Sequence, residues 1–144
     1  MNTVGKLLKA KDPKVWTVAK DCTVFDAHEL MLEHKISSVV VVEKDKVVGI
    51  FTENDFVQKV GLDCKDTDTM LIETVMTKDP LTVSPEKTIS DCMTLMIDNH
   101  IRHLPVVENG RLIGIVSVSD VVKDLIEELE FHVEQLTNYI QGFR

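Results

Sequence analysis

The sequence contains few cysteines, no long apolar stretch and no excess of basic residues. Its three cysteines, Cys22, Cys64 and Cys92, form no C-x-x-C pair. An odd number of cysteines without metal-ligand spacing indicates reduced thiols in a reducing compartment. No apolar run approaches the ~18 residues of a membrane-spanning helix, and residues 1–16 lack the apolar core of a signal peptide. These absences predict a cytoplasmic protein without a membrane segment.

The charge balance is acidic. Lysine and arginine number 16 against 24 aspartates and glutamates, which leaves a formal net charge of −8 in a chain of 144 residues. A general nucleic-acid-binding protein would present a basic stripe to the phosphate backbone, so nucleic acid is not an expected partner. A local cationic patch can still hold a small anionic ligand on an acidic protein.

Motifs of the common enzyme classes are also missing. The sequence contains no Walker A loop, no dinucleotide-binding glycine fingerprint and no nucleophile elbow. Its five histidines are not spaced as a set of metal ligands. We therefore expect no catalytic residue and no bound metal, and predict that the protein is not an enzyme.

What the sequence does contain is an internal duplication. A shift of 65 residues places 16–59 on 81–124 without a gap, with 14 identical pairs among 44. The identical pairs include Gly49 with Gly114 and Asp55 with Asp120. Self-similarity at a fixed spacing indicates repeated structural units, and two copies predict a pseudo-two-fold relationship.

Each copy has the pattern of a strand, a helix, two strands and a second helix. Thr-x-x-Asp capping patterns and amphipathic spacing mark the first helix, and β-branched residues mark the paired strands. The second helix begins near Glu53 in one copy and near Ser119 in the other. The expected strands lie at 15–18, 38–43 and 46–51, and at 81–83, 103–108 and 111–116.

This order predicts an α+β fold of α/β-like character. Two pseudo-symmetric β-α-β-β-α repeats pack as one module, because each copy alone is too short to form a stable hydrophobic core. A long C-terminal helix follows the module. The expected division is a first repeat at 1–61, a connecting segment ending in a helical turn at 62–76, a second repeat at 77–124 and a helical extension at 125–144.

One motif occurs at matching places in both copies, where a strand passes into a helix. It reads GIFTEND from Gly49 and GIVSVSD from Gly114. A hydroxyl and an acid three residues apart form a capping box at a helix N-terminus. The same groups can bind a ligand, because a carboxylate accepts hydrogen bonds from both hydroxyls of a ribose and the helix N-terminus attracts an anion. Both interpretations stay open at this point.

The doubled motif, the element order and the segment HIRHLPVVENGRLIG from His100 resemble a tandem pair of cystathionine-β-synthase (CBS) domains, the Bateman module. The resemblance covers almost the whole chain and is to stand-alone CBS-pair proteins. It implies a compact pair of repeats with a cleft between them. It also implies an adenosine ligand, which is AMP, ADP or ATP, or in some members NAD(H) or S-adenosylmethionine.

By this resemblance the stronger ligand site surrounds Asp120, which would accept the ribose hydroxyls. Arg102 and His103 form the only candidate cation cluster for a phosphate, and arginine matches the geometry of a phosphate. The alternative is that both are exposed residues at a strand start. Trp16 is either a core residue or a wall for the base. The other residues implied for this site are Ser117, Ser119, Ile115, Val15, Ile36 and Ser37.

A second site around Asp55 is expected to be weaker. The positions that match Arg102 and His103 are Ser37 and Ser38, so this copy lacks the cation cluster. Such a site would bind weakly, take a neutral adenosine group or stay empty. Its other implied residues are Thr52, Asn54, Ile50, Ser38, Pro80, Leu81 and Ile101.

The C-terminal segment carries a heptad pattern of apolar residues. We predict a helix from about Ser119 to Tyr139, with this seam packed either against another chain or against its own domain. CBS pairs commonly dimerise into a disc of four repeats, so the resemblance implies a homodimer. The spacing alternates between four and three residues along Val122, Ile126, Leu129, Val133, Leu136 and Ile140.

Together these observations predict a regulatory sensor of adenine nucleotides. A ligand bound between the repeats would change their relative angle, and a protein partner or the dimer would respond. The alternative is an interaction or scaffold module without a ligand, in which the motifs serve only as caps. Mutation of Asp120 separates the two, because a scaffold would lose only a cap worth about 1 kcal/mol.

Overall fold

The computed structural model describes residues 2–12, 14–61 and 66–142. The first repeat consists of β1 (Thr17–Ala19), α2 (Val24–His34), β2 (Ser38–Glu43), β3 (Lys46–Thr52), the single turn α3 (Glu53–Asp55) and the π-helical turn η1 (Phe56–Val60). The second consists of α4 (Ile89–Asn99), β5 (His103–Glu108), β6 (Arg111–Ser117) and α5 (Val118–Gln141). The remaining elements are α1 (Val4–Ala10), the 3-10 turn η3 (Ile72–Thr74) and β4 (Thr77–Lys78).

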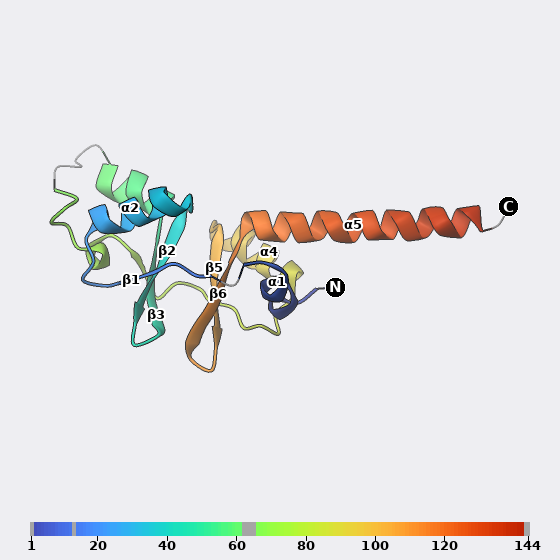
Figure 1. Ribbon diagram of the computed structural model, residues 1–144, viewed down its shortest axis with the longest axis horizontal. Helices are drawn as coiled ribbons and strands as arrows, with labels where there is room; N and C mark the ends of the chain where they lie inside the picture. Colours follow the sequence, from blue (N-terminus) through green and yellow to red (C-terminus); the bar gives the residue numbers. More distant parts are fainter. Residues whose placement is uncertain (1, 13, 62–65, 143–144) are drawn as a thin grey trace.

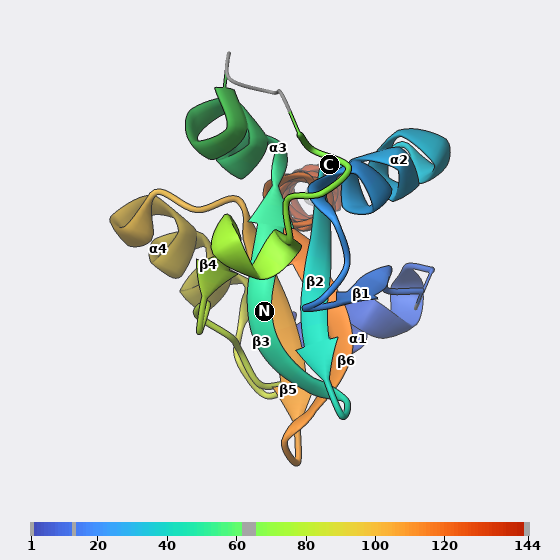
Figure 2. The same cartoon turned by 90° about the vertical axis from the view of Figure 1, so that its left-hand side faces the viewer.

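The two repeats lie side by side, and α5 projects from the second (Figure 1). The first repeat holds a four-stranded sheet in the order β1-β2-β3-β4, and the second holds the hairpin β5-β6. Both hairpins are antiparallel, and both carry an irregularity in register directly after a matching valine, Val41 or Val106. Seen from the end, the β5-β6 hairpin lies behind the β2-β3 hairpin (Figure 2). The pseudo-symmetry therefore extends to the detail of the strand pairing.

Each repeat is completed by the chain that precedes the other repeat. In the second repeat, Val4 N donates to Lys87 O at 2.8 Å, which ties α1 to the start of α4. In the first repeat, Val24 N donates to Met70 O at 2.8 Å, which ties the connecting segment to the start of α2. Val4 is fully buried in the core of the second repeat, and Ile72 is fully buried in the core of the first. Residues from 1–61 therefore contribute to the core of the second repeat, and residues from 62–76 contribute to the core of the first. The sequence boundaries at residues 61 and 76 stay a proposal.

Two glycines allow these exchanged segments to approach the strands. A Cβ atom on Gly114 would lie 2.7 Å from Leu8 Cδ2 on α1, and a Cβ atom on Gly49 would lie 2.3 Å from Met76 Sδ. Both distances are shorter than real Cβ contacts allow, so any side chain at either position would force its neighbour to move. The glycine of the doubled motif is thus a packing residue in both repeats.

The expected strand at 81–83 is reduced to a single parallel bridge between Val83 and Val106. In the first repeat, Val40 N donates to Trp16 O at 3.3 Å and extends the pairing of β1 with β2. The matching residue in the second repeat is Pro105, which has no N–H to donate. The bond that would extend the parallel ladder towards Leu81 therefore cannot form in that repeat.

The boundaries of three elements differ from the predictions. Strand β1 begins two residues later than the expected segment 15–18 and ends at Ala19. The helix expected from Glu53 has one α-helical turn and continues as the π-helical turn η1. Helix α5 begins one residue before Ser119 and ends two residues after Tyr139. No helix among the described ranges is both long enough and apolar enough to cross a membrane.

Cys22 and Cys92 are free thiols, and Cys64 lies outside the described residues. Burial, together with the neighbouring charge of Asp91, raises the pKa of Cys92 to about 11. A buried thiol with a raised pKa is a poor nucleophile. Cys92 therefore acts as an apolar core residue.

Candidate functional site

Both copies of the doubled motif form capping boxes. Asp120 N donates to Ser117 Oγ at 3.2 Å, and Ser117 N donates back to Asp120 Oδ2 at 2.9 Å. Thr52 and Asp55 exchange the same two bonds at 3.2 and 3.0 Å. The capping interpretation is confirmed for both motifs. The difference between the motifs lies in what else surrounds each carboxylate.

Lys11 is the additional partner of Asp120. It caps the C-terminus of α1, and its Nζ donates to Asp120 Oδ2 at 2.7 Å and to Ile115 O at 2.9 Å. Helix α1 reaches this position because Leu8 packs against the bare Cα of Gly114 on β6. The Asp120 side chain keeps 23% of its exposure, and Oδ1 accepts no hydrogen bond from the described residues. One oxygen of this carboxylate is therefore free to accept a bond from a ligand.

The charge state of Asp120 suits that role. Partial burial alone would raise the pKa of Asp120. The hydrogen bonds from Lys11 and the Ser117 N–H, together with the Lys11 charge, lower the pKa by more than burial raises it. The resulting pKa lies below the usual 3.8 of an aspartate. Asp120 is therefore ionised at neutral pH, and an ionised carboxylate makes the stronger kind of hydrogen bond to a hydroxyl.

His103 joins the two repeats beside this cluster. A hydrogen bond of 2.9 Å links its Nε2 to Ser37 Oγ of the first repeat. Burial lowers the pKa of His103 below 6.5, against the opposing charges of Asp120 and Glu53. The imidazole is therefore neutral at pH 7 and does not supply the cation that the sequence suggested. Lys11 is the cation that lies on Asp120.

Arg102 contributes its backbone to the same junction. Its carbonyl accepts from Val118 N at 3.0 Å, as the Ser37 carbonyl accepts from Glu53 N at the matching place in the first repeat. The residue is exposed. Arg102 thus lies exposed directly before β5, with a charged group reachable from solvent, and its contact with a phosphate stays a prediction.

The surroundings of Asp55 are closed. Thr52 N and Oγ1 donate to Asp55 Oδ2, at 3.0 and 3.2 Å. Thr77 Oγ1 donates to Oδ1 at 3.2 Å, and Lys59 Nζ lies 3.3 Å from the same oxygen. The Asp55 side chain keeps only 10% of its exposure. Both carboxylate oxygens are therefore engaged within the protein.

The apolar residues implied for the Asp120 site have different surroundings. Val15 lines a hollow of about 390 Å³, together with Thr17, Val42, Asp45, Arg111, Leu112 and Ile113. The Trp16 ring stacks on His34 with 3.5 Å between centroids, and Lys14 Nζ lies 4.2 Å from its centroid. Ile36 packs against the core of the first repeat. Ser119 lines a shallow hollow on α5.

Those implied for the Asp55 site are mostly structural or exposed. Ile50 and Ser38 are buried in the β2-β3 hairpin, and Ile101 packs against the core of the second repeat. Asn54 is exposed in the turn α3. Pro80 is half-buried and Leu81 is exposed, in the segment after β4.

Three residues at these carboxylates escaped the sequence interpretation. Lys59 could have been found, because a lysine four residues after an aspartate on a helix is a common ion-pair spacing. Lys11 and Thr77 gave no such signal. They lie in the segments that the repeats exchange. Lys11 is 109 residues from Asp120 in the sequence, and Thr77 is 22 residues from Asp55.

Comparison with known proteins agrees with this geometry. A family model described as CBS domain matches residues 7–61 and 72–127. The chain belongs to the CBS domain family. The predicted tandem pair and its fold class are thereby confirmed.

Several CBS proteins are similar over most of their length. The CBS domain-containing protein CBSX3, mitochondrial, of Arabidopsis thaliana is 33% identical over 97% of this chain and 72% of its own. The CBS-domain containing protein ATU1752 of Agrobacterium tumefaciens superimposes with a TM-score of 0.80 and 37% identity, over 85% of this chain and 98% of its own. CBSX2, crystallised in complex with AMP, superimposes with a TM-score of 0.73 and 25% identity, over 88% and 98%.

Proposed function

We propose that this CBS pair is a regulatory module that binds an adenine nucleotide at Asp120, between its repeats. One observation carries the proposal: an ionised, partly exposed carboxylate with a free oxygen lies where the end of α1, β6 and α5 meet. The AMP complex of CBSX2 supports the ligand class. The favoured ligands are AMP, ADP and ATP, with NAD(H) and S-adenosylmethionine as the further adenosyl compounds to test.

The contacts divide naturally over the parts of a nucleotide. Asp120 Oδ1 would accept from the ribose hydroxyls, and the Ser117 hydroxyl lies beside it. Lys11 and Arg102 would meet the phosphate, because a lysine acts as a point charge and an arginine as a planar fork. The base would extend along β6 towards Val15, since Ile113 and Ile115 share one face of the strand about 7 Å apart.

Regulation would act through the junction. The bonds between Ser37 and His103 and between Lys11 and Asp120 come from different repeats or from the exchanged helix. A ligand that competes for Asp120 would change these bonds and thereby the relation of the repeats. A protein partner or a second copy of the chain would respond to that change, and no chemical step is assigned to the module.

A second candidate is a scaffold without a ligand. The observation in its favour is that all four Ser/Thr-x-x-Asp pairs, at Thr23, Thr52, Thr88 and Ser117, act as helix caps. A cap needs no ligand to account for it. The two candidates differ in whether an adenosine compound stabilises the fold.

The test is thermal unfolding of the wild type and of Asp120→Ala with AMP, ADP, ATP, NADH and S-adenosylmethionine. A ligand at 100 times its Kd adds about 2.7 kcal/mol, which shifts the Tm of a chain of this size by several degrees. We expect one compound or more to shift the wild type and none to shift Asp120→Ala.

Asp91→Ala is the matched control. It removes the equivalent acid of the capping box at the start of α4 but leaves the junction untouched. This variant should keep the ligand response of the wild type. Flat curves for the wild type across all five compounds, with flat titration calorimetry, would reject the nucleotide site and leave the scaffold.

A further inference from the structure

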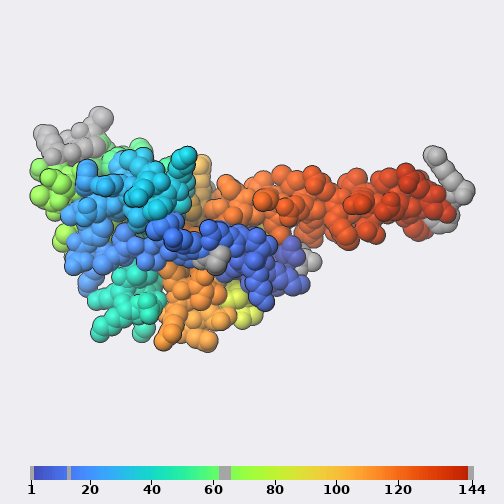
Figure 3. Space-filling model, in the orientation of Figure 1, coloured from blue at the N-terminus to red at the C-terminus, as the bar shows by residue number. Residues whose placement is uncertain are grey.

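Helix α5 extends far beyond the module that it belongs to. It runs over 24 residues from Val118 to Gln141, and most of its length projects away from the second repeat (Figure 3). Val121 and Asp124 are buried and Leu125 packs against the core, whereas every residue from Leu129 to Gly142 is exposed. A helix in water gains most of its stability from packing an apolar face. The outer half of α5 has no such packing within its own chain.

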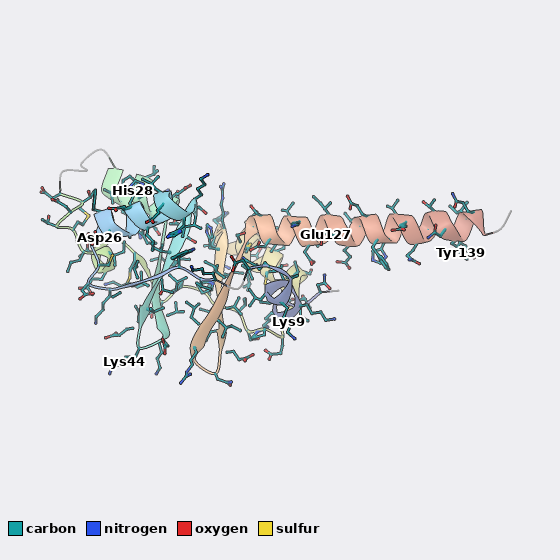
Figure 4. All side chains as sticks on the ribbon, viewed as in Figure 1. Lys9, Asp26, His28, Lys44, Glu127 and Tyr139 are labelled. Carbon is teal, nitrogen blue, oxygen red and sulfur yellow. The ribbon has the colours of Figure 1, made fainter. Side chains whose placement is uncertain are left out.

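The apolar seam that the heptad pattern predicted lies on this free part. Its side chains are 46 to 64% exposed, and side chains project along the whole length of α5 (Figure 4). The end nearest the module carries a shallow, open hollow on the surface of α5. The hollow is lined by Val118, Ser119, Val122, Lys123, Ile126 and Glu127. The alternative in which the seam packs on its own domain is therefore wrong for the described structure.

We propose that α5 pairs with α5 of a second copy of this chain as a parallel, two-stranded coiled coil. The residue types at the seam favour a second copy of the chain as the partner. The alternating spacing assigns Ile126, Val133 and Ile140 to position a, and Leu129 and Leu136 to position d. β-branched residues at a with leucine at d favour parallel dimers over trimers and tetramers. Val122, the first d residue, is the one departure.

The flanking charges agree with the parallel arrangement. Positions e are occupied by Lys123, Glu130 and Thr137, and positions g by Leu125, His132 and Tyr139. In a parallel pair each g residue meets the e residue five positions later on the other chain. Leu125 then meets Glu130 and His132 meets Thr137, so no like charges face one another. An antiparallel pair that keeps all six seam layers would instead bring the two copies of Glu130 together.

The geometry gives such a pair an adequate length. The seam from Val122 to Ile140 extends over about 27 Å at the helical rise of ~1.5 Å per residue. A parallel pair has two-fold symmetry and places both CBS modules at the same end. Asp120 lies in the first turn of the same helix, so the proposed ligand site and the proposed interface share one rigid element. The interface itself does not depend on the ligand.

The first measurement is the mass of the full chain in solution by sedimentation equilibrium over a wide range of concentration. The wild type should form a dimer, and Leu129→Asp with Leu136→Asp should be monomeric. Phe131→Asp is the matched control, because Phe131 lies at position f of the same helix and is 57% exposed against 64% for Leu129. This control should stay dimeric.

The second measurement tests the direction of pairing. In a parallel pair residue 133 meets its own copy, so oxidised Val133→Cys should yield a cross-linked dimer beyond any background that the native cysteines give in the wild type. A monomeric wild type would overturn the proposal and leave the seam available to a different protein. A dimer that the double substitution does not affect, or an equal loss of dimer in Phe131→Asp, would also overturn it. So would a dimeric Val133→Cys that does not cross-link above wild type.

Discussion

Asp55 and Asp120 occupy matching positions in two copies of one motif, yet their surroundings differ. Asp120 keeps a free oxygen and an ion pair to Lys11, whereas both oxygens of Asp55 are engaged. Part of the difference comes from the helix that follows. Lys59 pairs with Asp55, but the matching residue in the second repeat is Asp124, which accepts from Asn2 at 2.7 Å. A duplicated motif thus keeps its cap while its neighbours decide whether it is open to a ligand.

Replacement of the two carboxylates should lower the free energy of unfolding by different amounts. Asp55→Ala removes the carboxylate of a residue that is only 7% exposed and leaves the donors of half-buried Thr52 and exposed Thr77 without this acceptor, which should lower the free energy of unfolding by about 2 kcal/mol. Asp120→Ala removes a more exposed cap and should cost about 1 kcal/mol. Urea denaturation measures both. Equal losses for the two variants would contradict the distinction between a closed and an open site.

The two motif glycines should also respond unequally to an added methyl group. Gly49→Ala would press on Met76, which is only 9% exposed in the core of the first repeat, and should cost about 2 kcal/mol. Gly114→Ala would press on Leu8 of α1, which is only partly buried, and should cost about 1 kcal/mol. The comparison of urea midpoints checks the order, and a larger loss for Gly114→Ala would reverse our account of the packing.

The two lysines should be distinguished by ligand affinity. If Lys11 meets the phosphate, Lys11→Gln should weaken AMP relative to adenosine by about tenfold, equivalent to ~1.4 kcal/mol. Lys59→Gln changes an ion pair at the closed site and should leave both affinities unchanged. Titration calorimetry of both ligands checks this. An equal change for AMP and adenosine in Lys11→Gln would show that Lys11 acts only as a competitor for Asp120.

The smallest expected effect is a pH dependence from His103 of the second repeat, whose matching residue in the first repeat is Ser38. The pKa of His103 is lowered in the folded state, mainly by burial, so the unfolded chain binds more protons as the pH falls below 6.5. Stability from the neutral imidazole is thus full above that pH and declines below it. Charges of Asp120, Glu53, Arg102 and Lys11 act on the same ring.

The measurement is the free energy of unfolding between about pH 5 and 8, the range in which histidine is the side chain that titrates. The wild type should lose stability towards pH 5, and His103→Gln should show a flatter profile over this range. Asp120 titrates at lower pH and does not interfere, since its pKa lies below 3.8. Identical profiles for the two proteins would show that His103 does not cause the pH dependence.

Much of the fold was accessible from local pattern. The capping pairs at Thr23, Thr88 and Ser117 appear where the pattern places them. Asparagine followed by glycine between two strand patterns is typical of a hairpin turn, and Asn109 and Gly110 both have positive φ between β5 and β6. The misses have identifiable causes. Pro105 removes one donor from the parallel ladder of the second repeat, an effect visible only once the pairing partner is known.

The candidate site was less accessible. The sequence pointed to Asp120, because an acid three residues after a cap serine has a local signature. It also pointed to Arg102 and His103 as cations, and the structure leaves His103 neutral, because burial outweighs the nearby carboxylates. No local pattern pointed to Lys11, since its partner lies 109 residues further along the chain.

Short-range spacing was therefore sufficient for the repeats, the caps and the heptad seam of α5, because each depends on residues that are near neighbours on one helix or one hairpin. Tertiary structure alone decided that α1 completes the second repeat and the connecting segment completes the first. That exchange places Lys11 on Asp120 and Thr77 on Asp55. Whether a carboxylate is open or closed depends on which distant side chain reaches it, and that is determined by packing rather than by the motif.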